Sequence, residues 1–110
     1  MLQDTIDQIE AKLRDAGSLK AGQREELFTL LATLKSEVAG LSRTHADEAR
    51  SIAGYAGVSA HEATRAQRNE TLLEHSVAGL RASVAGFEKS HPQLVNAVNR
   101  IATTLANLGI

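Results

Sequence analysis

Histidine is the residue type in this sequence with the widest range of chemistry, because its imidazole binds metals and exchanges a proton near neutral pH. The 110-residue chain has four histidines: His45, His61, His75 and His91. His61 and Glu62 begin the zinc-protease pattern His-Glu-x-x-His, but Arg65 occupies the position of the second histidine. Two zinc ligands one helical turn apart therefore cannot form, and we predict no metalloprotease chemistry.

Pairs of glutamate and histidine are the next candidates. Glu88 and His91 have the Glu-x-x-His spacing of di-iron bundles, but the pair spans a predicted helix break before Pro92. Glu74 and His75 are predicted to lie at the solvated edge of a helix. The sequence therefore predicts no catalytic residue, no metal and no cofactor. The candidates for a polar site, should one exist, are His61, Glu62, Arg65, Glu74, His75 and His91.

His45 and His91 occupy similar positions, each directly after a hydroxyl residue at the predicted start of a helix. A residue at such a position ordinarily caps the turn or packs across it. Alternatively, the two histidines form a metal site or a pH-sensitive site if the fold brings them together. The positive end of a helix dipole disfavours a protonated imidazole, which weighs against a pH switch.

Other catalytic and binding patterns are absent from the sequence. The chain has no cysteine, so it has no thiolate nucleophile and no disulfide. It contains neither a glycine-rich phosphate loop nor a Gly-x-Ser-x-Gly motif. Twelve basic residues against thirteen acidic ones leave a net charge of −1, without the basic surplus of nucleic-acid-binding proteins. We predict a protein that is not an enzyme and does not bind nucleic acid.

The distribution of apolar residues predicts a cytoplasmic protein without a membrane span. The first twelve residues carry several acids and lack the apolar stretch of a secretory signal. No segment reaches the roughly 18 consecutive apolar residues that cross a bilayer.

Apolar residues recur at alternating steps of three and four, which is typical of amphipathic helices. The pattern predicts five helices, at about residues 2–16, 20–43, 46–66, 70–89 and 92–108. Only 3% of the residues are aromatic, so the core must be aliphatic. Connections of only a few residues favour antiparallel neighbours. We therefore predict an all-α fold, a single domain over residues 1–110 arranged as an antiparallel up-down bundle.

The second and fourth predicted helices carry the strongest apolar stripes, which we call the seams. The seam residues, with large apolar neighbours, are Leu27, Phe28, Leu30, Leu31, Leu34, Val38, Leu41, Leu73, Val77, Leu80, Val84 and Phe87. At the end of the fifth helix, Gly109 and Ile110 are predicted to form a Schellman cap and an ordered C-terminus.

The third predicted helix is less regular, because Gly54 and Gly57 lie inside it. Each glycine costs about 1 kcal/mol relative to alanine, so the helix is expected either to bend or break near Gly57 or to use the glycines for close approach of a neighbour. Thr44 with Asp47 suggests a cap for its start, and Ser90 is the N-cap candidate of the fifth helix, with Pro92 in the first turn.

Two stretches 46 residues apart resemble each other. Val-Ala-Gly, a large apolar residue, a basic residue, a hydroxyl residue and histidine recur in this order at 38–45 and 84–91. The same offset relates the apolar positions of about 24–56 to those of 70–102. We predict a duplicated helical hairpin; the alternative is a chance alignment of two similar helices.

The unequal helix lengths suggest self-association. A second helix of about 24 residues spans about 36 Å, while the first reaches only about 22 Å, which leaves apolar surface uncovered. Phe28, Leu30 and Leu72 lie beside the seams and would widen the exposed surface. Large apolar patches mark association surfaces, and two-fold dimers are the commonest oligomers. We therefore expect a homo-oligomer, with a dimer as the simplest form; the alternative is a monomer whose other helices cover this surface.

Several runs of the sequence together resemble a family of short bacterial helical proteins of unknown function. They are 59–65, 72–76, 79–80, 87–92 and several residues of 99–110, and the resemblance extends over most of the chain. The resemblance implies a bacterial origin and a single helical domain, and it carries no catalytic residues. His61, Glu62, Arg65, His75 and His91 belong to the shared pattern.

Two hypotheses of different classes follow. The leading one is a non-enzymatic, self-associating helical protein that serves as an adaptor or as a regulatory partner of an unidentified protein. The other is a metal- or small-ligand-binding bundle that uses His61, Glu62, Arg65, Glu74 and His75. The second hypothesis requires the third and fourth helices to turn these polar groups toward one another.

Overall fold

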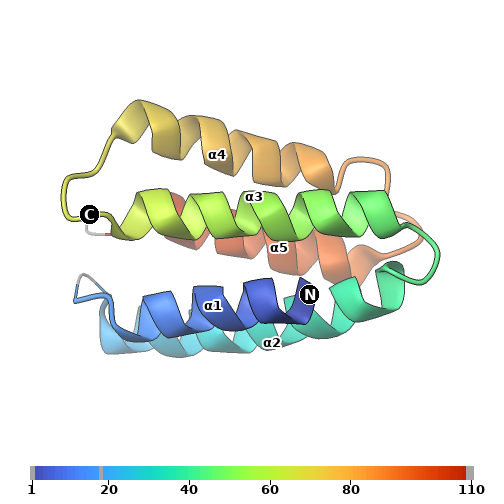
Figure 1. Ribbon diagram of the computed structural model, residues 1–110, viewed down its shortest axis with the longest axis horizontal. Coiled ribbons are helices and arrows are strands. Elements are labelled where there is room, and N and C mark those ends of the chain that lie inside the picture. The colour runs from blue at the N-terminus through green and yellow to red at the C-terminus, as the bar shows by residue number, and fades with distance from the viewer. Residues whose placement is uncertain (1, 18, 109–110) are drawn as a thin grey trace.

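The computed structural model describes residues 2–17 and 19–108 and confirms the all-α prediction. In these residues the chain forms five α-helices and no strand (Figure 1). The helices are α1 (Leu2–Arg14), α2 (Ala21–Leu41), α3 (Ala46–Thr64), α4 (Glu70–Ser83) and α5 (Pro92–Ala106). None of the helices in this part of the chain is long and apolar enough to span a membrane.

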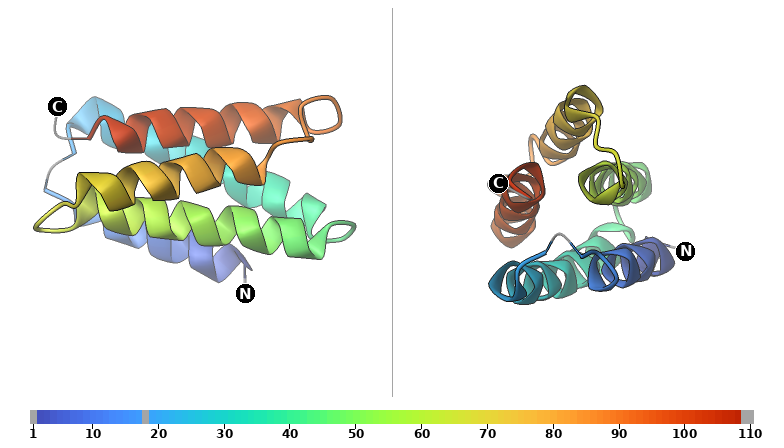
Figure 2. Two further views of the ribbon diagram at one scale, coloured as in Figure 1. Left: turned by 90° about the horizontal axis from the view of Figure 1, so that it is seen from above. Right: turned by 90° about the vertical axis from the view of Figure 1, so that its left-hand side faces the viewer.

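The helices lie along the long axis of a body measuring 37 × 24 × 23 Å. Figure 1 shows that the chain reverses its direction along this axis at each connection. Seen end-on in Figure 2, α1 and α2 lie side by side beneath α3 and α5, and α4 covers the opposite side. The helix α3 packs mainly against α4 and α1, and α2 packs mainly against α5.

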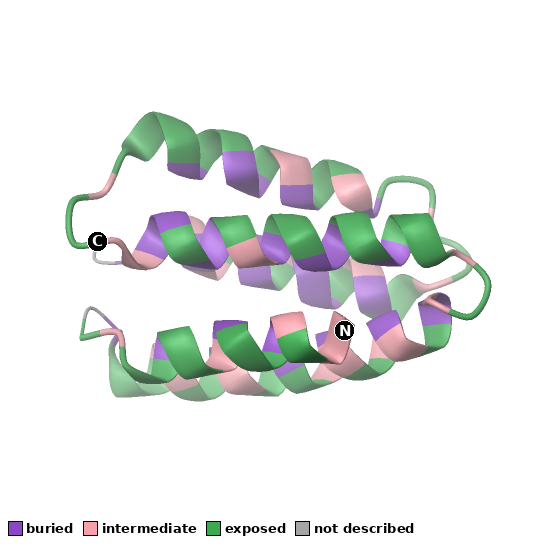
Figure 3. Cartoon of the chain, in the orientation of Figure 1, coloured by how far each residue is buried: buried purple, intermediate pink, exposed green. Residues whose placement is uncertain are grey.

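The seams form the core of the single chain, as the purple inward faces in Figure 3 show. The buried seam residues are Leu27, Leu30, Leu31, Leu34, Val38, Leu41, Leu73, Val77, Leu80 and Val84. The expectation that Leu30 widens an exposed patch was wrong, because α5 lies along α2 and leaves Leu30 only 9% exposed. Phe28 is half-buried, with the guanidinium of Arg14 lying 5.4 Å from its ring centroid. Leu72 remains exposed.

The fourth helix is shorter than predicted, because it ends at Ser83 and not near residue 89. Gly86 adopts φ +96°, a conformation that ends helical structure and that glycine adopts without a steric penalty. The Glu88 carboxylate accepts a hydrogen bond from the Gly86 N–H at 2.8 Å and holds this turn. Phe87 therefore lies in the turn between α4 and α5, half-buried, and not on a helical seam.

The predicted caps at two helix starts were also wrong. The N-cap positions of α3 and α5 belong to His45 and His91, and neither makes a side-chain cap hydrogen bond. Pro92 is in the first turn of α5, as expected. The cap predicted for Gly109 and Ile110 lies outside the described residues.

The helix α3 is continuous, so it does not break near Gly57. A Cβ built on Gly54 would meet nothing within 4 Å, and one on Gly57 would make an ordinary 3.8 Å contact with Thr5 of α1. Neither glycine is therefore required for close approach. The crowded glycine is Gly79 on α4, where a Cβ would lie 2.3 Å from the Tyr55 ring of α3.

Candidate functional site

Glu62 is the most buried carboxylate among the predicted polar candidates. It lies on α3 with 8% of its surface exposed, and its Oε1 accepts a hydrogen bond from Arg65 Nη1 at 2.9 Å. His61 Nε2 lies 3.9 Å from the other carboxylate oxygen. An ionised carboxylate in such a position must be paired, because burial without a partner costs several kcal/mol. The Glu62–Arg65 pair therefore has a structural role.

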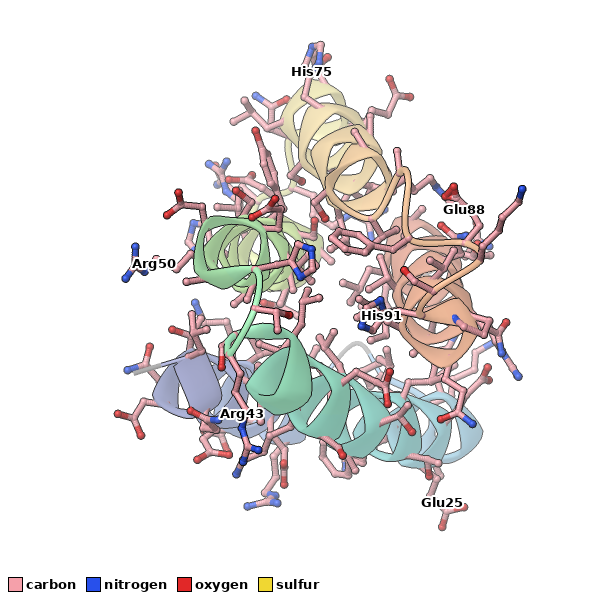
Figure 4. The ribbon with its side chains drawn as sticks, turned by 90° about the vertical axis from the view of Figure 1, so that its right-hand side faces the viewer. Glu25, Arg43, Arg50, His75, Glu88 and His91 are labelled. Atoms are coloured by element: carbon pink, nitrogen blue, oxygen red, sulfur yellow. The ribbon has the colours of Figure 1, made fainter. Side chains whose placement is uncertain are left out.

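The remaining candidates lie on different helices. His61 Nδ1 lies 3.5 Å from Lys12 Nζ of α1. Glu74 and His75 are exposed on α4, and His75 points outward at the edge of the bundle in Figure 4. Of the five residues in the ligand-binding hypothesis, the structure brings Glu62 and His75 to one groove. Among the residues described, no group of three or more histidine and acidic side chains is arranged to hold a metal ion.

This groove is a depression of about 320 Å³ between α3 and α4, and most of its surface is apolar. It is lined by Tyr55, Val58, Glu62, Leu72, His75 and Ser76. A second depression of about 240 Å³ adjoins it on α3, lined by Ser51, Gly54, Tyr55 and Val58. We refer to the surface formed by these two sets of residues as the α3/α4 face.

The α3/α4 face carries the three large apolar side chains that are exposed in the described part of the chain. Tyr55 is 45%, Val58 49% and Leu72 45% exposed. Leu72 was expected from the sequence to be exposed, whereas the exposure of Tyr55 and Val58 was not predicted. On α3 both residues lie outside the stripe of mostly small buried residues, and this position was the signal that could have found them. The stripe consists of Ala49, Ile52, Ala53, Ala56, Ala60 and Ala63.

Small residues let α3 and α4 approach closely beneath this face. The ring of Tyr55 lies over Gly79, where a Cβ would displace the ring. Ser59 on α3 and Ser76 on α4 are both buried. The Ser76 hydroxyl donates to the Leu73 carbonyl at 3.0 Å, whereas the Ser59 hydroxyl has no hydrogen-bond partner among the described residues.

A second cluster closes the end of the bundle where α3 and α5 begin. His45, Phe87 and His91 form a triangle of edge-to-face contacts, with ring centroids 5.4, 5.5 and 6.4 Å apart. His45 Nδ1 is hydrogen-bonded to the Thr44 hydroxyl at 2.8 Å, and His91 Nδ1 to the Ser90 hydroxyl at 2.9 Å. The fold thus brings the two histidines together around an aromatic ring, and the contacts are those of a packed turn.

The polar contacts on the other side of the molecule join neighbouring helices. Lys35 Nζ of α2 donates a hydrogen bond to Asp7 Oδ1 of α1 at 2.7 Å, and this bond raises the pKa of Lys35. Arg100 of α5 pairs with Glu26 of α2 at 3.1 Å. These pairs lie on exposed surface and away from both clusters, so they contribute to helix pairing and not to a site.

Comparison with known proteins places the chain in a family without a known activity. Neither the curated proteins nor the solved structures contain a match to it. A model of one protein family, described as a domain of unknown function, matches residues 2–110. This match spans all five helices together with both clusters, and the chain therefore belongs to the DUF4404 family.

Proposed function

We propose that this chain is a non-enzymatic, self-associating helical protein whose contact surface is the α3/α4 face. The observation that carries the proposal is the clustering of Tyr55, Val58 and Leu72, each about half exposed, on adjacent helices. Apolar patches on soluble proteins mark association surfaces. The seam residues belong to the core of the single chain, so the proposed contact does not use them.

The exposed apolar side chains of the α3/α4 face supply part of the energy that a protein contact needs. Fully burying a Val or Leu side chain is worth about 1.5–3 kcal/mol, so covering the exposed halves of three side chains gives about 3 kcal/mol. A stable interface covers roughly 800 Å² on each partner. The polar residues around the patch must therefore contribute as well, and α3, with its 19 residues, offers about 28 Å of length for them.

In this proposal the protein acts by docking, as an adaptor or a regulatory partner, and a dimer is the simplest oligomer. We place it in the cytoplasm of a bacterium. The balanced charge, with twelve basic and thirteen acidic residues, supports a protein partner over nucleic acid. The same face would serve a second copy or another protein, and self-association is the case that can be measured with the purified chain.

The test is native mass spectrometry and sedimentation velocity over a concentration series. Val58→Lys with Leu72→Lys places two charges in the patch at solvent-exposed positions, so the fold is retained while association is lost. The matched control, Ala32→Lys with Ser36→Lys, adds the same charge to the exposed side of α2. The proposal predicts a dimer for the wild type and the control and a monomer for the patch variant. A wild type that stays monomeric at high micromolar concentration contradicts it.

A second candidate function is the binding of a metal or small ligand in the groove between α3 and α4. The observation that favours it is the presence of Glu62 and His75 in the lining of one groove. Native mass spectrometry of protein purified without added metal reports any retained mass. Zn²⁺ titration of the wild type and of a His61→Ala, His75→Ala variant gives the second readout. Absence of bound mass and equal Zn²⁺ affinity in the two proteins would exclude this function.

A further inference from the structure

Three residues of α3 and its C-cap residue, Arg65, follow one line along the outward side of the helix. Asp47, Gly54, Val58 and Arg65 are separated by seven, four and seven positions. At 3.6 residues per turn, these steps keep all four within about 20° of a common line. The side chain of Asp47 is 94% and that of Arg65 35% exposed, Val58 is 49% exposed, and the space above Gly54 is open.

The residues along this line are complementary to the same line of a second copy that runs in the opposite direction. In chain order the line presents an acid, an open position, a large apolar residue and a base. The midpoint lies at position 56, because 47 and 65 are equally far from it, as are 54 and 58. An antiparallel copy centred there places Asp47 opposite Arg65 of the second copy, and Gly54 opposite Val58 of the second copy.

We propose that two copies of this chain form a two-fold dimer in which α3 packs antiparallel to α3 of the second copy in this register. The inference rests on the proposed self-association and specifies its geometry. Each Val58 enters the depression beside Gly54 of the other copy. This depression has a volume of about 240 Å³. Two Asp47–Arg65 ion pairs then lie at the ends of the contact, where each Arg65 also keeps its bond to Glu62.

The two-fold operation brings the rest of the α3/α4 face into the contact. The axis lies in the interface and perpendicular to α3, so α4 of each copy stays on the same side of the helix pair. Tyr55 and Leu72 of both copies therefore lie within one continuous apolar surface, and their burial adds to that of Val58.

A parallel arrangement of the same two helices is disfavoured by the same residues. It would place Asp47 opposite Asp47 and Arg65 opposite Arg65, so that both ends of the contact repel. Val58 would meet Val58, while the open positions above the two Gly54 residues would face each other and stay unfilled. Like charges directly opposed across an interface cost affinity, so the charge order selects the antiparallel form.

The absence of cysteine from the chain allows a direct test by cross-linking. Asp47→Cys and Arg65→Cys variants are prepared separately, mixed, and treated with a short bis-maleimide. The proposal predicts a cross-linked dimer in the mixture and none in either variant alone. In the antiparallel register, two cysteines at position 47 stand 18 residues apart along the helix, about 27 Å.

The Arg65→Cys variant loses the Glu62–Arg65 hydrogen bond, so a second cysteine pair that keeps Arg65 is also tested. Ser51 and His61 are exposed and are also equidistant from position 56, so a mixture of Ser51→Cys and His61→Cys is expected to cross-link as well. Native mass spectrometry of the untreated wild type separates the two possible failures. A monomer overturns the proposed self-association. A dimer in which Asp47→Cys links to itself, or in which neither mixture links, leaves self-association standing and overturns this geometry.

Discussion

His45 and His91 are 46 residues apart in the chain, and their rings meet at one end of the bundle with centroids 6.4 Å apart. The two residues share a backbone conformation, with φ, ψ of −135°, 64° at His45 and −137°, 62° at His91. The His45 N–H donates to the Leu41 carbonyl and the His91 N–H to the Phe87 carbonyl, both at 2.8 Å. The chain thus enters α3 and α5 in the same way, which supports the predicted duplication, although Gly40 is helical and its equivalent Gly86 is not. The duplication itself stays a prediction.

The aromatic cluster predicts a stability loss that depends on both rings. Phe87→Ala is expected to lower the free energy of unfolding by about 1–3 kcal/mol, because a half-buried ring and two edge-to-face contacts are lost. A double-mutant cycle with His45→Ala should give a coupling of about 0.5–1.5 kcal/mol, measured by urea unfolding. His75→Ala, an exposed histidine outside the ring cluster, serves as the control and should be near neutral. Additive effects of Phe87→Ala and His45→Ala would argue against the ring contacts.

Substitution by alanine should change stability differently at the two buried serines, Ser59 and Ser76. Ser59→Ala should leave stability unchanged or raise it, because the buried hydroxyl has no hydrogen-bond partner in the described part of the chain and its removal ends a desolvation penalty. Ser76→Ala should cost about 0.5–1.5 kcal/mol, because it removes the hydrogen bond to the Leu73 carbonyl. Thermal unfolding of the two variants gives the comparison. If Ser59→Ala is the more harmful of the two, the hydroxyl has a partner, such as an ordered water.

The loss of stability on removing an arginine should differ between the two acid–arginine pairs of α3, because Glu62 is buried and Asp47 is exposed. Arg65→Ala is expected to cost about 1 kcal/mol, a value reduced by the partial exposure of Arg65, because it leaves the Glu62 carboxylate buried without its guanidinium. Arg50→Ala removes the same i, i+3 pairing from the exposed Asp47 and should cost no more than about 0.5 kcal/mol.

Denaturant unfolding at two protein concentrations measures this difference between the arginines. An effect on the fold is the same at both concentrations, while an effect on association grows with concentration. Equal costs for the two arginine variants would show that the burial of Glu62 has no energetic consequence.

The contact between Gly79 and Tyr55 predicts that the effect of an added methyl group depends on the tyrosine. In the Tyr55→Ala background, Gly79→Ala should stabilise the protein by about 0.5–1 kcal/mol, because alanine is the better helix former. In the wild type the new Cβ displaces the ring, so the gain should be absent or reversed. Chemical denaturation of the four proteins in this cycle supplies the coupling. The same gain in both backgrounds would mean that the ring moves away without cost.

The sequence by itself determined the number of helices and the composition of the core. The steps of three and four that place Leu27, Leu31 and Leu34 on one stripe are a local property of the helix, and burial of that stripe follows from the hydrophobic effect. The same local signal did not locate the end of α4. Val84 continues the apolar period, yet Gly86 leaves the helical conformation and Phe87 turns toward the two histidines.

Only the tertiary structure decided which polar and apolar groups meet. The burial of Glu62, the exposure of Tyr55 and Val58 and the contact of His45 with His91 depend on how each helix is rotated against its neighbours. That rotation results from packing between residues distant in sequence, such as Tyr55 against Gly79. A periodic pattern tells which residues share a side of a helix, whereas the neighbours covering that side decide whether it becomes core or surface.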